Sequence, residues 1–255
     1  MSMISVIIPA LNVQGSLAPT LASLLHANSQ GMIREVIVSD GGSSDATASI
    51  ATEAGAQLIV GQKGRGGQLA RGAEAARGEW LLFLHADTQL EPGWEAVASA
   101  HMAGAYDRAA AAFRLRFDQK GVAPALVAAG ANFRSRFLKM PYGDQGLLIS
   151  RRHYERLGGF RPIPLFEDVD LVRRLVKEGG RRALRLLPAA AVTSADRYEK
   201  AGYVRRVLGN LHCLTLYFAG VSPHRIVEIY NGQATPSVAH RHGQTAPGRQ
   251  GKDAP

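Results

Sequence analysis

The chain has 255 residues, of which 46% are hydrophobic, and a formal net charge of +9, a composition typical of a globular protein. Its single cysteine excludes an internal disulfide framework, and no apolar run reaches the roughly 18 residues that a membrane span requires. The N-terminal segment lacks the charged region and long apolar run of a secretion signal, so we expect a cytoplasmic protein.

Short apolar runs alternate with helical patterns in the first 90 residues. Strands that read as buried on both faces are predicted at residues 4–10, 34–40, 56–61 and 79–87. Helical spacing falls between them, at residues 16–27, 45–54 and 67–77. Repeated strand–helix units predict a three-layer α/β fold with a mixed, mainly parallel sheet. Because ligands of such sheets bind at the carboxyl ends of the strands, the residues after each strand are the first candidates for a site.

The second predicted strand ends in "SDGGSSDAT", residues 39–47. Asp40 stands at the strand end, two glycines permit a tight turn, and the serines that follow can cap the next helix. The segment is therefore either one wall of a binding site or a well-capped loop with no ligand.

The third predicted strand is followed by "GQKGRGGQLARG", residues 61–72, in which Lys63, Arg65 and Arg71 stand among closely spaced glycines at a helix start. Glycine lets backbone N–H groups approach an anion, and the helix N-terminus adds a favourable potential. This pattern indicates a phosphate site, although it matches neither the P-loop nor the dinucleotide-binding motif. The surplus of positive charge also fits a phosphate-bearing partner, or simply a solubilising surface.

The fourth predicted strand, in "EWLLFLHADT", places the carboxylate of Asp87 at the end of a buried apolar run. With "SVIIPALN" and "SDGGSSDAT" before it, this stretch resembles family 2 glycosyltransferases of the GT-A fold. In that family the carboxylate after the fourth strand holds a divalent metal that bridges the donor diphosphate, which would make Asp87 the metal ligand. The alternative role of Asp87 is a helix N-cap or a strand terminator.

The metal site departs from the family pattern, because His85 and Thr88 replace two of its acidic residues. Mg²⁺ prefers oxygen ligands and an imidazole suits Mn²⁺, so the resemblance leaves the metal open and the basic loop can carry part of the diphosphate charge. The resemblance implies a UDP-sugar donor, with Asp40 on the uracil. The implied donor site comprises Pro9, Ala10, Leu11, Asn12, Asp40, Gly41, Lys63, Arg65, Gly66, Gln68, His85, Ala86 and Asp87.

The second half of the chain contains "FEDVDL", with Glu167 and Asp168 at the start of an amphipathic helix. Acidic residues in a first helical turn are ordinarily partners of the helix dipole. Family 2 enzymes, however, carry an acidic pair at the corresponding place. The resemblance therefore implies that Asp168 is the general base of an inverting displacement and that Glu167 supports it.

The motif "GDQG", residues 143–146, precedes a short strand, and its two glycines indicate a tight backbone beside a ligand. We expect Asp144 and Gln145 to face the sugar or the acceptor, with Arg152 binding an anionic acceptor. The competing interpretations are a turn with no ligand and scattered surface charge.

Three longer stretches, "GRGGQLARGAEAARGEWLLFLHADT", "PYGDQGLLISRR" and "PLFEDVDLVRRL", are similar to the selenium- and arsenosugar-related branch of family 2, which includes selenosugar synthase of selenoneine biosynthesis. The resemblance covers roughly residues 3 to 230. It implies selenophosphate as acceptor, a donor such as UDP-N-acetylglucosamine and a 1-seleno-sugar product. A polyprenyl phosphate, lipid or saccharide acceptor is the alternative. A basic nucleic-acid-binding protein, suggested by a pI near 10.0, lacks interleaved aromatic and basic residues and ranks below both.

We expect a single GT-A domain over residues 1–231, with a nucleotide-binding half to about residue 90 and an acceptor and catalytic half after it. Residues 194–220 read as a helix that closes the active site or mediates a homodimer, with the apolar side Tyr203, Val207, Leu211, Leu214 and Phe218. The remaining residues, 232–255, are rich in Pro, Gly, Gln and Ala without apolar periodicity, which predicts a disordered tail.

Overall fold

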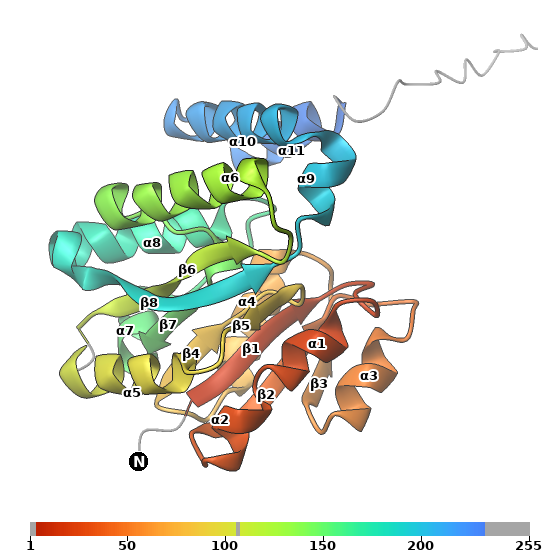
Figure 1. Ribbon diagram of the computed structural model, residues 1–255, viewed down its shortest axis with the longest axis vertical. Helices are drawn as coiled ribbons and strands as arrows, with labels where there is room; N and C mark the ends of the chain where they lie inside the picture. The colour runs from red at the N-terminus through yellow and green to blue at the C-terminus, as the bar shows by residue number, and fades with distance from the viewer. Residues whose placement is uncertain (1–3, 106–107, 233–255) are drawn as a thin grey trace, which may run out of the picture.

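The computed structural model describes residues 4–105 and 108–232 and contains one mixed β-sheet with helices on both faces (Figure 1). The strand order is β3-β2-β1-β4-β7-β6-β8-β5. The strands are β1 (Ile4–Ala10), β2 (Ile33–Asp40), β3 (Gln57–Val60), β4 (Trp80–Phe83), β5 (Thr88–Leu90), β6 (Ala110–Phe117), β7 (Leu147–Ser150) and β8 (Leu184–Thr193). The predicted three-layer α/β fold with a mainly parallel sheet is confirmed.

The pairing of β1 brings the predicted binding loops to one edge of the sheet. β1 is parallel to both β2 and β4, with Ala10 opposite Asp40 and Ile7 opposite Phe83. The carboxyl ends of these three strands therefore lie together. β7 then inserts antiparallel between β4 and β6, and β6 runs parallel to β8.

The helices follow from amphipathic patterns that cover the two faces of the sheet. They are α1 (Leu17–Ala22), α2 (Leu25–Ser29), α3 (Thr47–Glu53), α4 (Arg65–Ala75), α5 (Trp94–Ala105), α6 (Val122–Phe133), α7 (Arg151–Arg156), α8 (Glu167–Gly179), α9 (Asp196–Ala201), α10 (Tyr203–Phe218) and α11 (Pro223–Gly232), with short turns η1 (Arg134–Leu138), η2 (Gly143–Gln145) and η3 (Gly180–Ala183). On one face α1 and α5 bury Leu17 and Trp94, and on the other α4 and α8 bury Leu69 and Leu171. Each such side chain contributes about 1.5–3 kcal/mol by leaving water.

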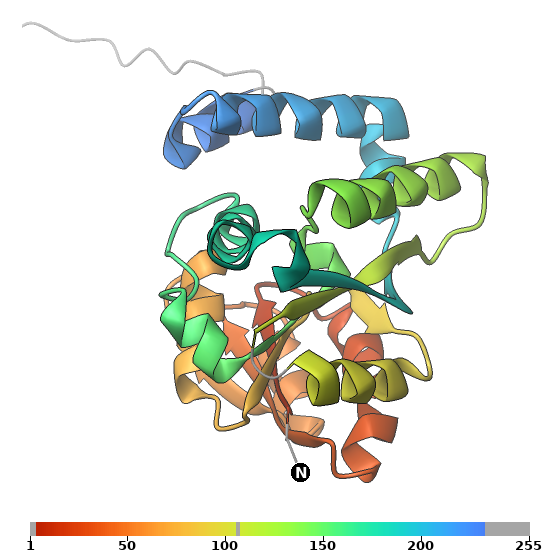
Figure 2. The same cartoon turned by 90° about the vertical axis from the view of Figure 1, so that its left-hand side faces the viewer.

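α6, α8, α10 and α11 lie at the end of the molecule away from α2 and the N-terminus (Figures 1 and 2). α10 packs on α6, α9 and α11. Its buried side chains, Cys213 and Leu214, join a cluster with Phe166 and Val169 at the start of α8. α10 is therefore fixed to the segment that carries the predicted catalytic acids.

The predicted strand at residues 79–87 is wrong in extent, because the run divides between two places in the sheet. β4 ends at Phe83, since its antiparallel partner β7 is only four residues long, and β5 begins at Thr88 beside β8 at the far edge. His85 and Asp87 lie on the crossing between these strands.

Three other predicted elements differ locally. The helix at residues 16–27 is interrupted at Ser23, whose hydroxyl donates a 2.7 Å hydrogen bond to the carbonyl of Thr20 and competes with the helical pattern. β3 is an edge strand with exposed and half-buried residues, not a strand buried on both faces. The helix at residues 194–220 breaks at Gly202, which has a φ of 81° that favours glycine.

The predicted tail lies outside the described residues apart from Gly232, the last residue of α11. Within the part of the chain that the structure describes, no helix is long and apolar enough to cross a membrane.

Candidate active site

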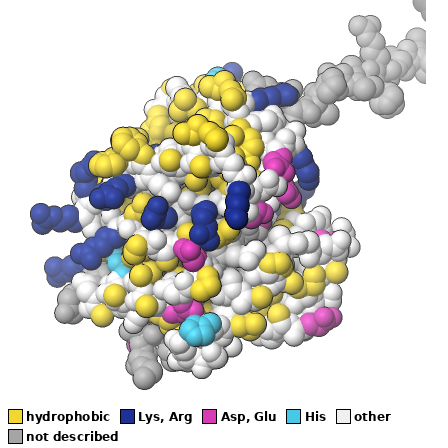
Figure 3. All heavy atoms as spheres, in the orientation of Figure 1, with side chains coloured by type: hydrophobic (Ala, Val, Ile, Leu, Met, Phe, Trp, Pro, Cys, Tyr) yellow, Lys and Arg dark blue, Asp and Glu magenta, His cyan; other side chains and the backbone are white. Residues whose placement is uncertain are grey.

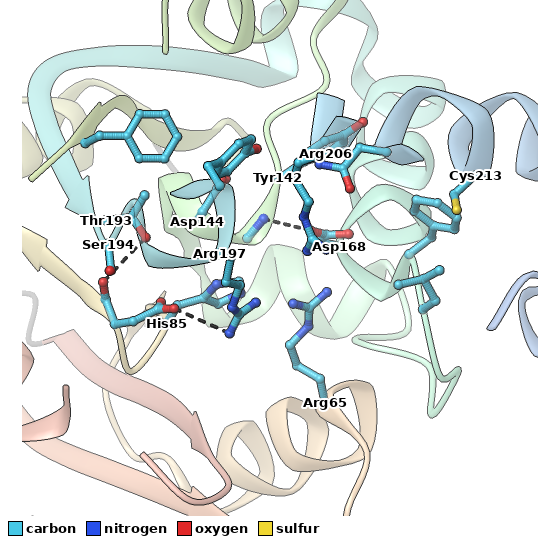
Figure 4. A pocket seen from close by; sticks show the side chains of 17 residues that line it. Arg65, His85, Tyr142, Asp144, Asp168, Thr193, Ser194, Arg197, Arg206 and Cys213 are labelled. Atoms are coloured by element: carbon cyan, nitrogen blue, oxygen red, sulfur yellow. Dashed lines mark hydrogen bonds and ion pairs between the residues drawn. The ribbon is translucent and has the colours of Figure 1, made fainter. Parts of the chain in front are cut away.

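A cavity of about 250 Å³ opens at the carboxyl edge of β4, where residues distant in the chain meet (Figure 4). Its wall contains acidic and basic groups together with one imidazole. These side chains are Arg65, His85, Asp87, Asp144, Asp168, Arg197 and Arg206. Three carboxylates and three guanidinium groups therefore share one small space.

Asp168 is held in place from two sides. Its Oδ2 accepts a 2.7 Å hydrogen bond from the backbone N–H of Gly143 in η2. The residue two before it, Phe166, adopts a left-handed φ of 64°, which is costly for a bulky side chain and must be stabilised by its surroundings. Phe166 is buried and its ring lies 4.9 Å from that of Tyr217 in α10. The start of α8 is thus positioned by η2 and by α10.

Glu167 does not line the cavity and forms an ion pair with Arg65, which does. Glu167 is 1% exposed, and burial together with Asp168 raises its pKa, while Arg65 opposes the shift. Burial alone would lower the pKa of Arg65, but Glu167 and Asp168 raise it. Gly66 lets the start of α4 approach the loop before α8, because a Cβ there would collide with the carbonyl of Arg161. Glu167 thereby directs the guanidinium of Arg65 into the cavity.

His85 and Asp87 project from the crossing between β4 and β5. Burial, together with Arg65 and Arg197, lowers the pKa of His85 well below its ordinary value, so the imidazole is neutral. It packs against Gly143, where a Cβ would collide with the ring. Asp87 Oδ2 lies 3.5 Å from the guanidinium of Arg197 on α9.

Asp144 is the most perturbed carboxyl in the cavity. Burial raises its pKa to about 6; Arg134 opposes the shift, and Asp168 and Asp87 add to it. Its Oδ1 is buried without a hydrogen-bond partner among the described residues. The neighbouring Tyr142 is covered by the guanidinium of Arg134, 3.5 Å from the ring centroid. Asp144 therefore exchanges a proton in the pH range where an enzyme works.

The predicted donor residues divide into two groups. Arg65, His85 and Asp87 line the cavity, whereas Pro9, Ala10, Leu11, Asn12, Asp40, Gly41, Lys63, Gly66, Gln68 and Ala86 do not. Asp40 is at the same edge of the sheet, one strand beyond β1, and is 2% exposed. Its carboxylate accepts hydrogen bonds from the N–H and hydroxyl of Ser43, so it faces its own loop. Asp87 and Asp168 converge, and Asp40 lies outside that cavity.

Two of the predicted donor residues hold the loops of the N-terminal half together. The buried Gln68 amide donates to the carbonyls of Ala10 and Ser39, at 2.7 and 2.9 Å. Asn12 Oδ1 accepts from the N–H of Ser44 at 2.9 Å. These contacts link the ends of β1 and β2 to α4, which shapes the sheet edge beside the cavity.

Two of the predicted acceptor residues, Gln145 and Arg152, do not line this cavity. Gln145 is fully buried, and its amide bonds the hydroxyl of Ser135 at 2.6 Å and the carbonyl of Phe113 at 3.0 Å, so it packs the core. Arg152 is exposed on α7 and does not line the cavity. Of the three, Asp144 lines the cavity.

Sequence reasoning missed the residues that α9 and α10 contribute. Arg197, Arg206 and Cys213 line the cavity, as does Tyr142 beside "GDQG". No motif in the sequence marks these positions. Their one signal is the prediction that this helical region closes the site.

No three His, Cys, Asp or Glu side chains within residues 4–105 and 108–232 are grouped closely enough to hold a metal ion by themselves. A cation at Asp87 would therefore take most of its coordination from a ligand such as a diphosphate. The neutral imidazole of His85 is a ligand that Mn²⁺ accepts more readily than Mg²⁺ does.

The family model described as Glycosyl transferase family 2 matches residues 5–153. PGL/p-HBAD biosynthesis glycosyltransferases of Mycobacterium tuberculosis and Mycobacterium bovis are 38% identical over 95 residues, which cover 34% of this chain and 36% of those proteins. The match thus spans about a third of the length of these relatives.

Solved structures show a related fold. Glucosyl-3-phosphoglycerate synthase from Mycobacterium tuberculosis superposes with a TM-score of 0.59 at 22% identity, covering 86% of this chain and 80% of that one. Mannosyl-3-phosphoglycerate synthase from Rubrobacter xylanophilus gives a TM-score of 0.56 at 17% identity, with 86% and 75% covered.

Proposed function

The chain belongs to glycosyl transferase family 2, and we propose that it transfers a sugar from a UDP-sugar to a small anionic acceptor, most specifically selenophosphate. The donor is UDP-N-acetylglucosamine in this proposal. The observation that carries it is the meeting of Asp87, Asp144 and Asp168 with three arginines in one cavity at the edge of a GT-A-like sheet.

The size of the cavity supports a small acceptor. At about 250 Å³ it is below the roughly 300–1,000 Å³ of pockets that enclose a drug-sized ligand. A sugar and a compact anion fit, while the uridine extends along the ends of β1 and β2. The solved glucosyl-3-phosphoglycerate synthase of related fold binds UDP-glucose, Mn²⁺ and phosphoglyceric acid. That complex likewise pairs a UDP-sugar with a small acidic molecule that carries phosphate.

The charged side chains have separate roles in the proposed inverting displacement. Arg197 lies on the Asp87 side with the donor diphosphate, and Arg65 and Arg206 bind the acceptor anion. The acceptor atom forms its bond to the anomeric carbon as the bond to the diphosphate breaks, and UDP leaves with the electron pair. Asp168, held by Gly143, takes any proton that the acceptor carries and orients an acceptor that is already an anion.

The proposed site also takes one divalent ion, next to Asp87. Asp87 would hold it, with His85 beside it, and the ion would supply positive charge to the diphosphate. Arg197 lies 3.5 Å from Asp87, so its guanidinium would neutralise part of the negative charge of the diphosphate as well.

An acceptor panel tests the function. The full chain is incubated with UDP-N-acetylglucosamine and, separately, selenophosphate, thiophosphate, phosphate and alcohol acceptors, with and without Mn²⁺, and products are identified by mass spectrometry. A 1-seleno-sugar is expected. If products form only with phosphate or thiophosphate, the acceptor is a small anion other than selenophosphate. If no product forms with any of the anions, the proposal is overturned.

A polyprenyl phosphate, lipid or saccharide acceptor is the second candidate. It is favoured by the relatives named for PGL/p-HBAD biosynthesis, which match about a third of this chain. Transfer to alcohol acceptors alone in the panel would support a lipid or saccharide acceptor that reacts through a hydroxyl group.

A further inference from the structure

α10 presents an apolar stripe on its outer side. Val204, Leu208, Leu211 and Phe218 are 74%, 59%, 57% and 48% exposed, and Val207 is 39% exposed. Their spacing of three, four and seven residues places them on one side of the helix. The opposite side lines the cavity with Arg206 and Cys213. Val207, Leu211 and Phe218, three residues of the predicted apolar side of this helix, therefore lie on its exposed side.

α6 and the turn η1 carry a second stripe of the same kind. Val122, Leu126 and Phe133 are 78%, 67% and 60% exposed, and Phe137 and Leu138 continue the series at 47% and 59%. The opposite side of α6 is buried against β6 through Ala128 and Ala131. Among the described residues, Arg173 lies over the ring of Phe218 and Arg136 near that of Phe137, and the residues of both stripes are still 39% exposed or more.

The two stripes lie on neighbouring helices and form one surface, which we call the α6–α10 face. α6 and α10 contact each other and lie side by side in both views of the ribbon (Figures 1 and 2). Figure 3 shows hydrophobic side chains gathered at this end of the molecule, with Lys and Arg side chains along its border. The face consists of Val122, Leu126, Phe133, Phe137, Leu138, Val204, Val207, Leu208, Leu211 and Phe218. A contiguous apolar surface of this kind marks an interaction site.

The helix segments that carry the two stripes have charge of one sign. Residues 122–138 and 203–218 contain four arginines and no aspartate or glutamate. Arg206 lines the cavity and Arg134 covers Tyr142, so the exposed Arg136 and Arg205 are the two that border the face. Arg181 donates a hydrogen bond to the carbonyl of Phe137, and Lys139 lies beside Leu138. Burial lowers the pKa of Lys139, and the nearby Arg181 and Arg136 add to the shift, so three basic groups lie close together at this end of the face. The nearest acidic residues along the chain from α10 are on the preceding helix, α9, which also carries two basic ones.

We propose that the α6–α10 face docks onto a bilayer that contains anionic lipids. The apolar stripes enter the interfacial region, and the basic side chains beside them contact the lipid phosphates. A second copy of the chain fits less well, because a two-fold interface through this face would oppose arginine to arginine. Docking would hold the outer side of α10 at the membrane while its inner side forms a wall of the cavity.

Vesicle flotation of the full chain tests this surface. Wild-type protein should float with vesicles of phosphatidylcholine and phosphatidylglycerol, and weakly with phosphatidylcholine alone. The double variant Leu208→Ser with Leu211→Ser should bind at least about tenfold less, because it interrupts the apolar stripe. Arg136→Gln and Arg205→Gln should each reduce binding about fivefold through the lost lipid attraction.

The matched control is Leu25→Ser, which removes a 64% exposed leucine from α2 at the opposite end of the molecule and should leave binding unchanged. Light scattering gives the oligomeric state of each variant. Failure of the wild type to float with anionic vesicles, or equal flotation of the stripe variant, would overturn the proposal. If the wild type does not bind vesicles but forms a dimer, and the stripe variant is a monomer, the face is assigned to a second copy instead. None of these variants changes a residue of the cavity, so the acceptor panel is an independent measurement.

Discussion

Replacing Asp144 by Asn should stabilise the protein above pH 6. The pKa of this carboxyl rises from its ordinary 3.8 to about 6 on folding, because it is buried near Asp168 and Asp87, and Arg134 offsets only part of the effect. A carboxyl with a raised pKa penalises the folded state when it is ionised. The penalty is full above the folded pKa and vanishes below the unfolded one, where both states hold the proton.

The magnitude follows from the size of the shift. About two pKa units at about 1.4 kcal/mol each set an upper limit of about 3 kcal/mol at pH 8. At pH 5, between the folded and unfolded pKa values, about half of that penalty remains. For a domain of this size the limit corresponds to a rise in Tm of about 6–12 °C at pH 8.

Thermal and urea unfolding of the wild type and of Asp144→Asn, at pH 8 and pH 5 without ligand, measure this difference. The exposed Glu53→Gln on α3 is the control and should shift the free energy of unfolding by less than about 0.5 kcal/mol. A variant that is less stable than the wild type at pH 8, or a difference that does not shrink toward pH 5, would refute the reasoning.

Three further substitutions test the site. Asp168→Asn should lower kcat about 10²- to 10⁴-fold with a protonated acceptor and less than about tenfold with an anionic one, and unchanged turnover with both would remove its role. Gly143→Ala should lower kcat about 10²-fold in steady-state assays, because the new Cβ displaces His85 and the N–H that holds Asp168; wild-type kcat would show that the contact is dispensable. Asp40→Ala should weaken UDP binding in calorimetry and lower Tm by leaving Ser43 without its partner, whereas unchanged UDP affinity would leave only the structural role.

The sequence by itself determined the order of the first strands and the acidic motifs that follow them. Local periodicity predicts the apolar runs, and the resemblance of the motifs to family 2 glycosyltransferases named Asp87 and Asp168 as site residues; both line the cavity. Asp144 could be named as well, because a tight "GDQG" turn leaves few places for its carboxylate.

The tertiary structure decided which side chains meet. The ion pair of Arg65 with Glu167 joins residues 102 positions apart, and Arg197 and Arg206 enter the cavity from helices without any motif. Gln145 is a converse case: its neighbour Asp144 lines the cavity, but the amide of Gln145 is hydrogen-bonded inside the core. A position next to a site residue in the sequence therefore does not place a side chain in the site.

α10 shows the physical reason why sequence alone does not identify which side chains are buried. Its apolar residues occur around more than one side of the helix, and periodicity alone does not say which side meets the protein. Packing against Phe166 chose the side with Cys213 and Leu214, because only that side completes the buried cluster at the start of α8. The leucines and valines of the other side were thereby left in contact with solvent, and that outcome became visible only once the fold had placed the helix.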